Sequence, residues 1–131
     1  MDRETMQSLS EQVLAAWNTQ EVERVLACYT SDVDYRDPNT RGAVRGADAL
    51  RRYLTKLFAN WRMHWSLREA HLFGDGRGGT FLWHATFQRP GAEATIAIDG
   101  MDFVEMRGDR IARNEVCFDR AALAPLLAMA A

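Results

Sequence analysis

The chain has 131 residues, with 47% hydrophobic and 26% charged side chains, which is the balance of a globular domain rather than of a disordered chain. This length allows a sizeable core, so we expect residues 1–131 to form a single domain. The formal net charge of −2 provides no basic field for a nucleic-acid backbone, so we expect no nucleic-acid partner.

Cysteine usage and hydropathy indicate a cytoplasmic protein. Cys28 and Cys117 provide neither a disulfide framework nor a metal-ligand spacing, which favours reduced thiols. The opening segment Met1-Asp2-Arg3-Glu4 lacks the apolar core of a signal peptide. No stretch approaches the roughly 20 apolar residues that a membrane span needs. We therefore expect a soluble, cytoplasmic protein without a membrane partner.

The first half of the sequence predicts three helices and one strand. Apolar residues spaced by three and four predict an amphipathic first helix (Met6, Leu9, Val13, Trp17) and a short second one (Val22, Val25, Leu26, Tyr29). Residues 31–36 alternate in polarity and predict a strand, which ends at Asp37-Pro38-Asn39 because proline cannot donate to a ladder. Residues 42–46 are expected to form a loop. A third helix is predicted from Ala47, with a continuous apolar stripe (Leu50, Tyr53, Leu54, Leu57, Phe58, Trp61).

The second half predicts a series of long antiparallel strands. Four segments, 64–73, 80–88, 94–106 and 110–118, are separated by turns that contain glycine. Asp119 is placed to cap a final helix, whose regular part is expected to begin late because of Pro125. Helices followed by strands predict an α+β fold, in which a cone-shaped, curved antiparallel sheet packs against the N-terminal helices. The wide end of such a cone can hold a small molecule.

The three histidines do not predict a metal site. His64 and His71 are seven residues apart in one predicted strand, so we expect them on opposite faces of the sheet. No histidine has a second one directly beside it or one helical turn away. We expect neither a metal nor another cofactor, and the face on which His84 lies stays open.

An aspartate at the end of the first predicted strand is a candidate general base. Asp37 precedes a proline and lies beside a helix with an apolar stripe, where burial would raise its pKa and make it a usable base. The alternative is that Asp37 only orders the Pro38-Asn39 turn through side-chain to backbone hydrogen bonds.

A second acid, Asp102, lies between Met101 and Phe103 in a long predicted strand, so it must be paired, protonated or solvated. Its partner across the last hairpin depends on the length of the turn. A two-residue turn at Gly108-Asp109 places Asp102 opposite Glu115, whereas a three-residue turn places it opposite Asn114. The sequence leaves both registers open.

Two segments carry a resemblance to a known family. Tyr35-Arg36-Asp37-Pro38, followed by Arg45-Gly46-Ala47-Asp48, resembles the SnoaL-like and ketosteroid-isomerase-like branch of the nuclear-transport-factor-two-like superfamily. The run from Asp99 to Asp119 is similar to the closing hairpin of that branch. The likeness spans nearly the whole chain and implies a cystatin-like α+β barrel that forms a homodimer. It says little about the reaction, because one fold hosts many functions.

The resemblance also implies roles for individual residues. Asp37 falls at the general base of ketosteroid isomerase, and Asp102 falls at the oxyanion-binding acid if the last hairpin is one residue shorter. Trp17, Tyr53, Trp83 and Phe87 fall at pocket walls, and we add Asn114 and Phe118 from the last strand as substrate-binding residues. One position departs from the pattern: Val13 replaces the tyrosine that donates a hydrogen bond to the oxyanion. Losing such a donor typically costs about 10² to 10³ in rate, which argues against steroid isomerisation.

These observations leave three functions open. The first is an enzyme of isomerase or polyketide-cyclase type, which moves a proton on a hydrophobic carbonyl compound with Asp37 as base and protonated Asp102 as donor. The second is a non-catalytic pocket that binds a hydrophobic metabolite. The third is an interaction module that uses the outer face of the sheet to form a homodimer. Some of five aromatic residues are expected on that face (Trp65, Phe73, Phe81, Trp83, Phe103).

Overall fold

The structure is a computed structural model that describes residues 1–129. Its elements are α1 (Arg3–Thr19), α2 (Val22–Leu26), β1 (Tyr29–Arg36), β2 (Val44–Arg45), α3 (Ala47–Asn60), β3 (Arg62–Leu72), β4 (Gly78–Gln88), β5 (Thr95–Arg107), β6 (Arg110–Cys117), the 3₁₀ helix η1 (Arg120–Leu123) and α4 (Ala124–Met129). Asp2 caps α1 by accepting the N–H of Thr5, and Asp119 caps η1 by accepting the N–H of Ala121.

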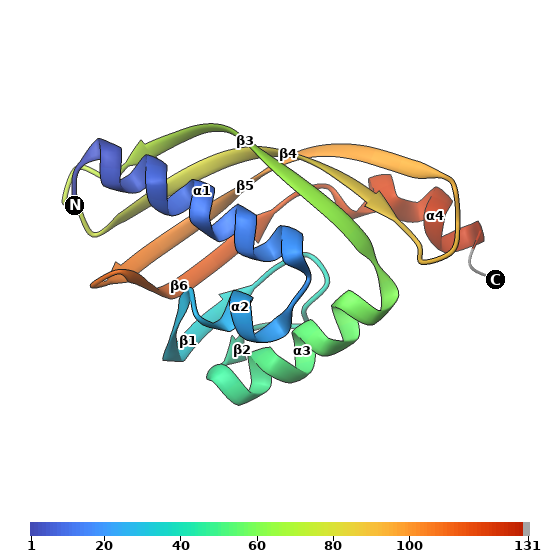
Figure 1. The fold of residues 1–131 in the computed structure, drawn as a ribbon, viewed down its shortest axis with the longest axis horizontal. Helices are drawn as coiled ribbons and strands as arrows, with labels where there is room; N and C mark the ends of the chain where they lie inside the picture. The colour runs from blue at the N-terminus through green and yellow to red at the C-terminus, as the bar shows by residue number, and fades with distance from the viewer. Residues whose placement is uncertain (130–131) are drawn as a thin grey trace.

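The strands form one six-stranded sheet in the order β2-β1-β6-β5-β4-β3. All neighbours are antiparallel except β1 and β6, which run parallel. The sheet curves without closing, and Figure 1 shows α1 running along β3 and β4 while α3 lies beside β1 and β2. This confirms the expected α+β fold with a curved sheet packed against N-terminal helices. The parallel pair and the short strand β2, within the expected loop, were not predicted.

The concave face of the sheet and the helices enclose the core. Along β4 the side chains alternate, with Phe81, Trp83 and Phe87 buried and His84 exposed. Nδ1 of His84 lies 2.8 Å from Oδ1 of the exposed Asp99, so this histidine lies on the outer, convex face. Trp65 is buried, as is Phe81, so the outer face is less aromatic than the sequence allowed. Strand β5 contributes Phe103 to that face.

A β-bulge in β3 corrects the expectation for His64 and His71. The register with β4 shifts between Leu67 and Glu69, so that His64 lies opposite Thr86 and His71 lies opposite Thr80. Because Thr80 and Thr86 share a face of β4, both histidines lie on the outer face rather than on opposite faces. Within residues 1–129, no group of three His, Cys, Asp or Glu side chains is arranged to hold a metal ion.

A second bulge decides the register of the last hairpin. Arg107 pairs with Arg110 across a two-residue turn, but the pairing then shifts between Glu105 and Met106 and skips Ala112. Asp102 therefore lies opposite Val116, and neither register considered from the sequence is correct. The bulge nevertheless leaves Asp102 and Asn114 on one face of the sheet, because Val116 and Asn114 are two residues apart.

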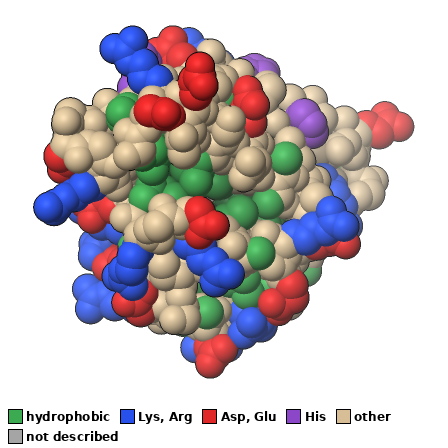
Figure 2. All heavy atoms as spheres, turned by 60° about the vertical axis from the view of Figure 1, so that its left-hand side comes forward, with side chains coloured by type: hydrophobic (Ala, Val, Ile, Leu, Met, Phe, Trp, Pro, Cys, Tyr) green, Lys and Arg blue, Asp and Glu red, His purple; other side chains and the backbone are tan. Residues whose placement is uncertain are grey.

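The molecular surface mixes both signs of charge. On the face shown in Figure 2, Lys and Arg side chains alternate with Asp and Glu side chains around a recessed group of hydrophobic ones. In the part of the chain that the structure describes, no helix has the length and hydropathy needed to cross a membrane.

Candidate functional site

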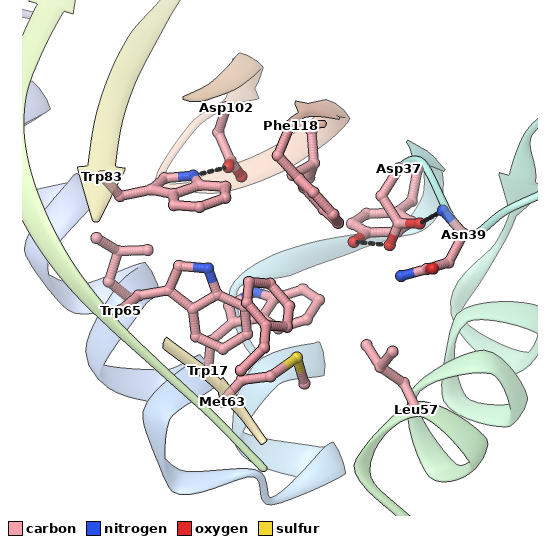
Figure 3. Close-up of a pocket in the computed structure, with 13 residues that line it drawn as sticks. Trp17, Asp37, Asn39, Leu57, Met63, Trp65, Trp83, Asp102 and Phe118 are labelled. Atoms are coloured by element: carbon pink, nitrogen blue, oxygen red, sulfur yellow. Dashed lines mark hydrogen bonds between the residues drawn. The ribbon is translucent and has the colours of Figure 1, made fainter. Parts of the chain in front are cut away.

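A pocket opens between the concave face of the sheet and helices α1 and α3. Its walls come from nearly every element of the fold: Leu14, Trp17, Tyr35, Asp37, Asn39, Leu57, Met63, Trp65, Trp83, Phe87, Asp102, Val116 and Phe118. It encloses about 420 Å³ with its solvent-open mouth included. The pocket is thus a narrow slot with aromatic walls, and Figure 3 shows Asp102 and Asp37 on either side of Phe118.

Six of the thirteen lining residues are aromatic, and they come from α1, β1, β3, β4 and the segment after β6. Trp65 packs edge-to-face against Trp17 with ring centroids 5.5 Å apart, and against Trp83 at 6.3 Å. Phe118 closes the ring of contacts against Trp83 at 6.0 Å and Phe87 at 5.6 Å. These separations lie in the range of favourable aromatic pairs, so the rings hold one another in place.

Asp102 is the buried acid of the pocket, with 6% of its surface exposed. Its Oδ1 accepts the indole N–H of Trp83 at 2.7 Å, and its Oδ2 accepts the amide N–H of Asn114 at 3.0 Å. Burial raises the pKa of Asp102 to about 6, although the hydrogen bonds from Asn114 and Trp83 lower it; the charge of Asp37 adds to the rise. This pKa is close to physiological pH.

A chain of hydrogen bonds behind Asp102 has a fixed direction. The indole N–H of Trp17 can only donate, and it donates to the hydroxyl oxygen of Tyr29 at 3.2 Å. Tyr29 then donates to Oδ1 of Asn114 at 2.7 Å, which turns the amide NH₂ of Asn114 toward Asp102 and the carbonyl oxygen of Phe103. Both groups that contact the Asp102 carboxyl are therefore donors. This arrangement favours the carboxylate form of Asp102, whereas burial favours the neutral acid.

Asp37 lies at the mouth of the pocket and is partly buried. Its Oδ1 accepts the backbone N–H groups of Asn39 and Thr40, at 2.7 and 3.1 Å. Its Oδ2 accepts the hydroxyls of Tyr35 and Tyr53, both at 2.6 Å. Four donors thus occupy the lone pairs of this carboxylate, and Asp37 does order the turn after β1.

The two tyrosines beside Asp37 are held in their neutral form. Burial raises the pKa of Tyr35 well above its usual value, and the negative charge of Asp37 raises it further. The pKa of Tyr53 rises for the same two reasons, burial first. Since both hydroxyl protons point at Asp37, neither hydroxyl offers a proton to a ligand in this arrangement.

The site residues selected from the sequence fall into two groups, those that line the pocket and those that contact lining residues from behind. Asp37, Asp102, Trp17, Trp83, Phe87 and Phe118 line the pocket. Tyr53 and Asn114 do not line it but hold Asp37 and Asp102 from behind. Seven further residues line it and were not selected: Leu14, Tyr35, Asn39, Leu57, Met63, Trp65 and Val116. The period-two pattern of the strands could have indicated Met63 and Trp65, which alternate with exposed residues in β3.

Val13, the position at which the sequence departs from the isomerase pattern, is buried with 2% of its surface exposed and does not line the pocket. Among the described residues, the pocket wall contains no lysine, arginine or histidine. Of its three indole N–H groups, those of Trp17 and Trp83 donate within the protein, and that of Trp65 makes no hydrogen bond within residues 1–129. A ligand therefore meets two carboxylates, the neutral Trp65 indole and Asn39 amide, and apolar side chains.

Comparison with protein families gives one match. A family model described as a SnoaL-like domain matches residues 10–114 of the chain. No curated protein matches the sequence.

Many solved structures share the fold at low sequence identity. A protein with a ketosteroid isomerase-like fold from Catenulispora acidiphila, in complex with trimethylamine, is 15% identical with a TM-score of 0.79, over 90% of each chain. A candidate polyketide cyclase from Pseudomonas putida is 17% identical with a TM-score of 0.76, over 90% of this chain and 94% of that one. The epoxide hydrolase/cyclase-like enzyme SalBIII, which has a role in pyran ring formation in the polyether salinomycin, is 14% identical with a TM-score of 0.79, over 92% of this chain and 95% of that one.

Proposed function

Because the chain belongs to the SnoaL-like domain family, we propose that its pocket catalyses proton transfer on a small, hydrophobic carbonyl compound, as an isomerase or a polyketide cyclase does. The observation that carries this proposal is Asp102, a carboxyl buried in an aromatic pocket whose pKa is raised to about 6. A general base works best when its pKa lies near the operating pH, so that it is ionised and yet accepts a proton readily.

Of the two acids in the pocket, Asp102 is the better proton acceptor. Each of its oxygens accepts one hydrogen bond, from Trp83 and from Asn114, which leaves a lone pair on each for a substrate proton. The four donors on Asp37 leave no free lone pair, so Asp37 would have to break a hydrogen bond before it could act as a base. We therefore assign the base to Asp102 and an anchoring role to Asp37, whereas the sequence led us to expect Asp37 as the base and protonated Asp102 as the donor.

The aromatic walls supply the rest of the site. Trp17, Trp83, Phe87 and Phe118 line the slot and would hold a flat apolar substrate against Asp102. Fixing the substrate carbon beside the base is itself a large part of such a catalytic effect, because it removes the entropy cost of bringing the two together. Two proteins of the same fold support a small organic ligand: SalBIII has a role in pyran ring formation, and the protein from Catenulispora acidiphila is in complex with trimethylamine.

The test is the exchange of α-protons of hydrophobic ketones, beginning with 2-tetralone, against deuterium in D₂O followed by proton NMR. The wild type should accelerate exchange, and Asp102→Asn should lower that acceleration by about 10² or more. Asp37→Asn should retain it within about tenfold, since anchoring residues cost less than the base. Asp99→Asn removes an exposed acid from the outer face and is the matched control.

Two results would argue against this assignment. If Asp37→Asn removes the exchange and Asp102→Asn does not, the base is the acid first expected from the sequence. If the ketones bind to the wild type without exchanging protons, the pocket is a non-catalytic carrier of a hydrophobic metabolite. We also propose that the protein is a cytoplasmic homodimer, and the test of its assembly is given below.

A further inference from the structure

The pocket carries negative charge without a positive side chain to balance it. Asp102 and Asp37 both line it, and the charge of Asp37 contributes to the raised pKa of Asp102. Within the described residues, no lysine, arginine or histidine lines the wall. Outside the wall, the guanidinium of Arg120 contacts one lining residue: its Nε donates to Oδ1 of Asn39 at 2.7 Å.

The hydrogen-bond donors of the site are almost all committed to the protein's own acids. Tyr35 and Tyr53 donate to Asp37, and Trp83 and Asn114 donate to Asp102. Two neutral donors of the wall remain, the indole N–H of Trp65 and the side-chain amide of Asn39, whose Oδ1 accepts from Arg120. An oxyanion formed in the slot would therefore lie near two carboxylates, with these two neutral groups as its donors.

Positive charge is favoured in the same place for two reasons. The first is the attraction of the two carboxylates, one buried and one partly buried, which salt screens less than charges at the surface. The second is the wall of aromatic rings formed by Trp17, Trp65 and Trp83, with ring centroids 5.5 to 6.3 Å apart, since the faces of such rings attract cations. Figure 3 shows Trp83 and Trp65 on the same side of the cavity as Asp102.

From this charge balance we propose that the ligand of the pocket is a small organic cation, an alkylated ammonium or iminium group. The inference deepens the proposed function and rests on it for the chemical step. Asp102 removes the proton from the carbon next to an iminium group, and the electron pair of the broken C–H bond forms a C=C bond. The π pair of the C=N bond moves to nitrogen, which becomes neutral. The products are a neutral enamine and a neutral carboxylic acid, so no oxyanion donor is needed and the missing tyrosine at Val13 costs nothing.

The binding test uses three molecules of one shape that differ in charge. Choline is the cation, 3,3-dimethylbutan-1-ol is its neutral counterpart, and 3,3-dimethylbutanoate is the anion. Binding is followed by calorimetry and by the indole N–H signals of Trp65 and Trp83 in nitrogen-15 NMR. Choline should bind at least about tenfold more tightly than the alcohol, and the anion should not bind. Asp102→Asn should lower the affinity for choline by about tenfold or more and leave the affinity for the alcohol unchanged.

Several outcomes overturn the inference: no choline binding at millimolar concentration, an alcohol that binds as tightly as choline, or choline binding that is indifferent to Asp102→Asn. If Asp102→Asn does not fold, Asp37→Asn should weaken choline severalfold, and equal affinity in that variant also overturns it. Asp99→Asn is the control for loss of one negative charge elsewhere. If ketone exchange depends on Asp102 but choline does not bind, the cation proposal is refuted and the proposed function stands. If choline binds but no ketone exchanges its protons, the proposed function is refuted and the cation proposal stands.

Discussion

The indole N–H of Trp83 donates to Oδ1 of Asp102 at 2.7 Å, and this bond ties the buried acid to the aromatic wall of the pocket. Trp83 lies opposite Gly100 and Asp102 lies opposite Phe81, so the two side chains are diagonal neighbours on strands β4 and β5. The acid therefore stays in the wall even though burial disfavours its charge.

The first prediction concerns stability as a function of pH. The pKa of Asp102 is about 6 in the folded protein against 3.8 as the unperturbed value, so between these pH values the folded state holds a proton that the unfolded state releases. Raising the pH from about 4 to about 6 should then lower the free energy of unfolding by about 2 kcal/mol, because each pH unit contributes at most about 1.4 kcal/mol and the difference in bound protons is below one at both ends of this range. The variant Asp102→Asn has no carboxyl at this position, so its stability lacks this pH dependence. The difference in the free energy of unfolding between the wild type and Asp102→Asn should therefore change over that range, and a constant difference would contradict the raised pKa.

The second prediction concerns Asn114, which is fully buried and bonds both Tyr29 and Asp102. Asn114→Leu keeps the volume but leaves a buried hydroxyl and a buried carboxyl each short of a partner, so the free energy of unfolding should fall by about 2–4 kcal/mol. Asn60→Ala is the control, because the Asn60 amide bonds only the carbonyl of Lys56 at an exposed helix end. It should cost about 0.5 kcal/mol or less. Equal losses in urea denaturation would argue against a buried network.

A third prediction follows from the packing of Trp83 over a glycine. A Cβ placed on Gly100 would lie 2.4 Å from the Cη2 atom of Trp83 and 2.7 Å from the carbonyl oxygen of Cys117. Gly100→Ala should therefore displace the indole, shift its fluorescence and lower stability by about 1–3 kcal/mol. Gly74→Ala, where a Cβ meets no atom within 4 Å, is the matched control. An unchanged Trp83 indole signal in Gly100→Ala would show that the ring is not held there.

The fourth prediction is the homodimer. The outer face carries Leu82 and Met101 side by side across β4 and β5, with Phe103 beyond them, and 38% of Met101 is exposed. A second copy that covers this apolar strip would give a molar mass of about twice 14.9 kDa in light scattering. Leu82→Arg should shift the protein toward the monomer without loss of fold. A wild type that stays monomeric at all concentrations would contradict the proposal.

The sequence predicted the fold well because its signals are local. The three-and-four spacing of Met6, Leu9, Val13 and Trp17 defines the buried side of α1, and all four residues are buried. The partner of Asp102 could not be predicted, because the bulge at Ala112 follows from strand twist and packing rather than from the turn residues. The same limit explains His71, which a bulge in β3 moves to the face of His64.

For the site, the sequence indicated both acids but not the hydrogen bonds that each of them accepts. Asp37 was expected as a desolvated base, whereas the hydroxyls of Tyr35 and Tyr53 and two backbone N–H groups converge on it. Such convergence depends on three-dimensional proximity across 16 residues and has no signature in spacing. The direction of the hydrogen bonds that reach Asp102 depends in the same way on Trp17 and Tyr29, which are far from it in the chain.

The most direct measurement is the titration of the Asp102 carboxyl itself, followed by the carbon-13 chemical shift of its Cγ and assigned by comparison with Asp102→Asn. We predict a midpoint near pH 6, because burial outweighs the hydrogen bonds from Trp83 and Asn114. A midpoint at or below the ordinary aspartate value of 3.8 would contradict the account, since a carboxyl of that kind would be a poor acceptor for a substrate proton.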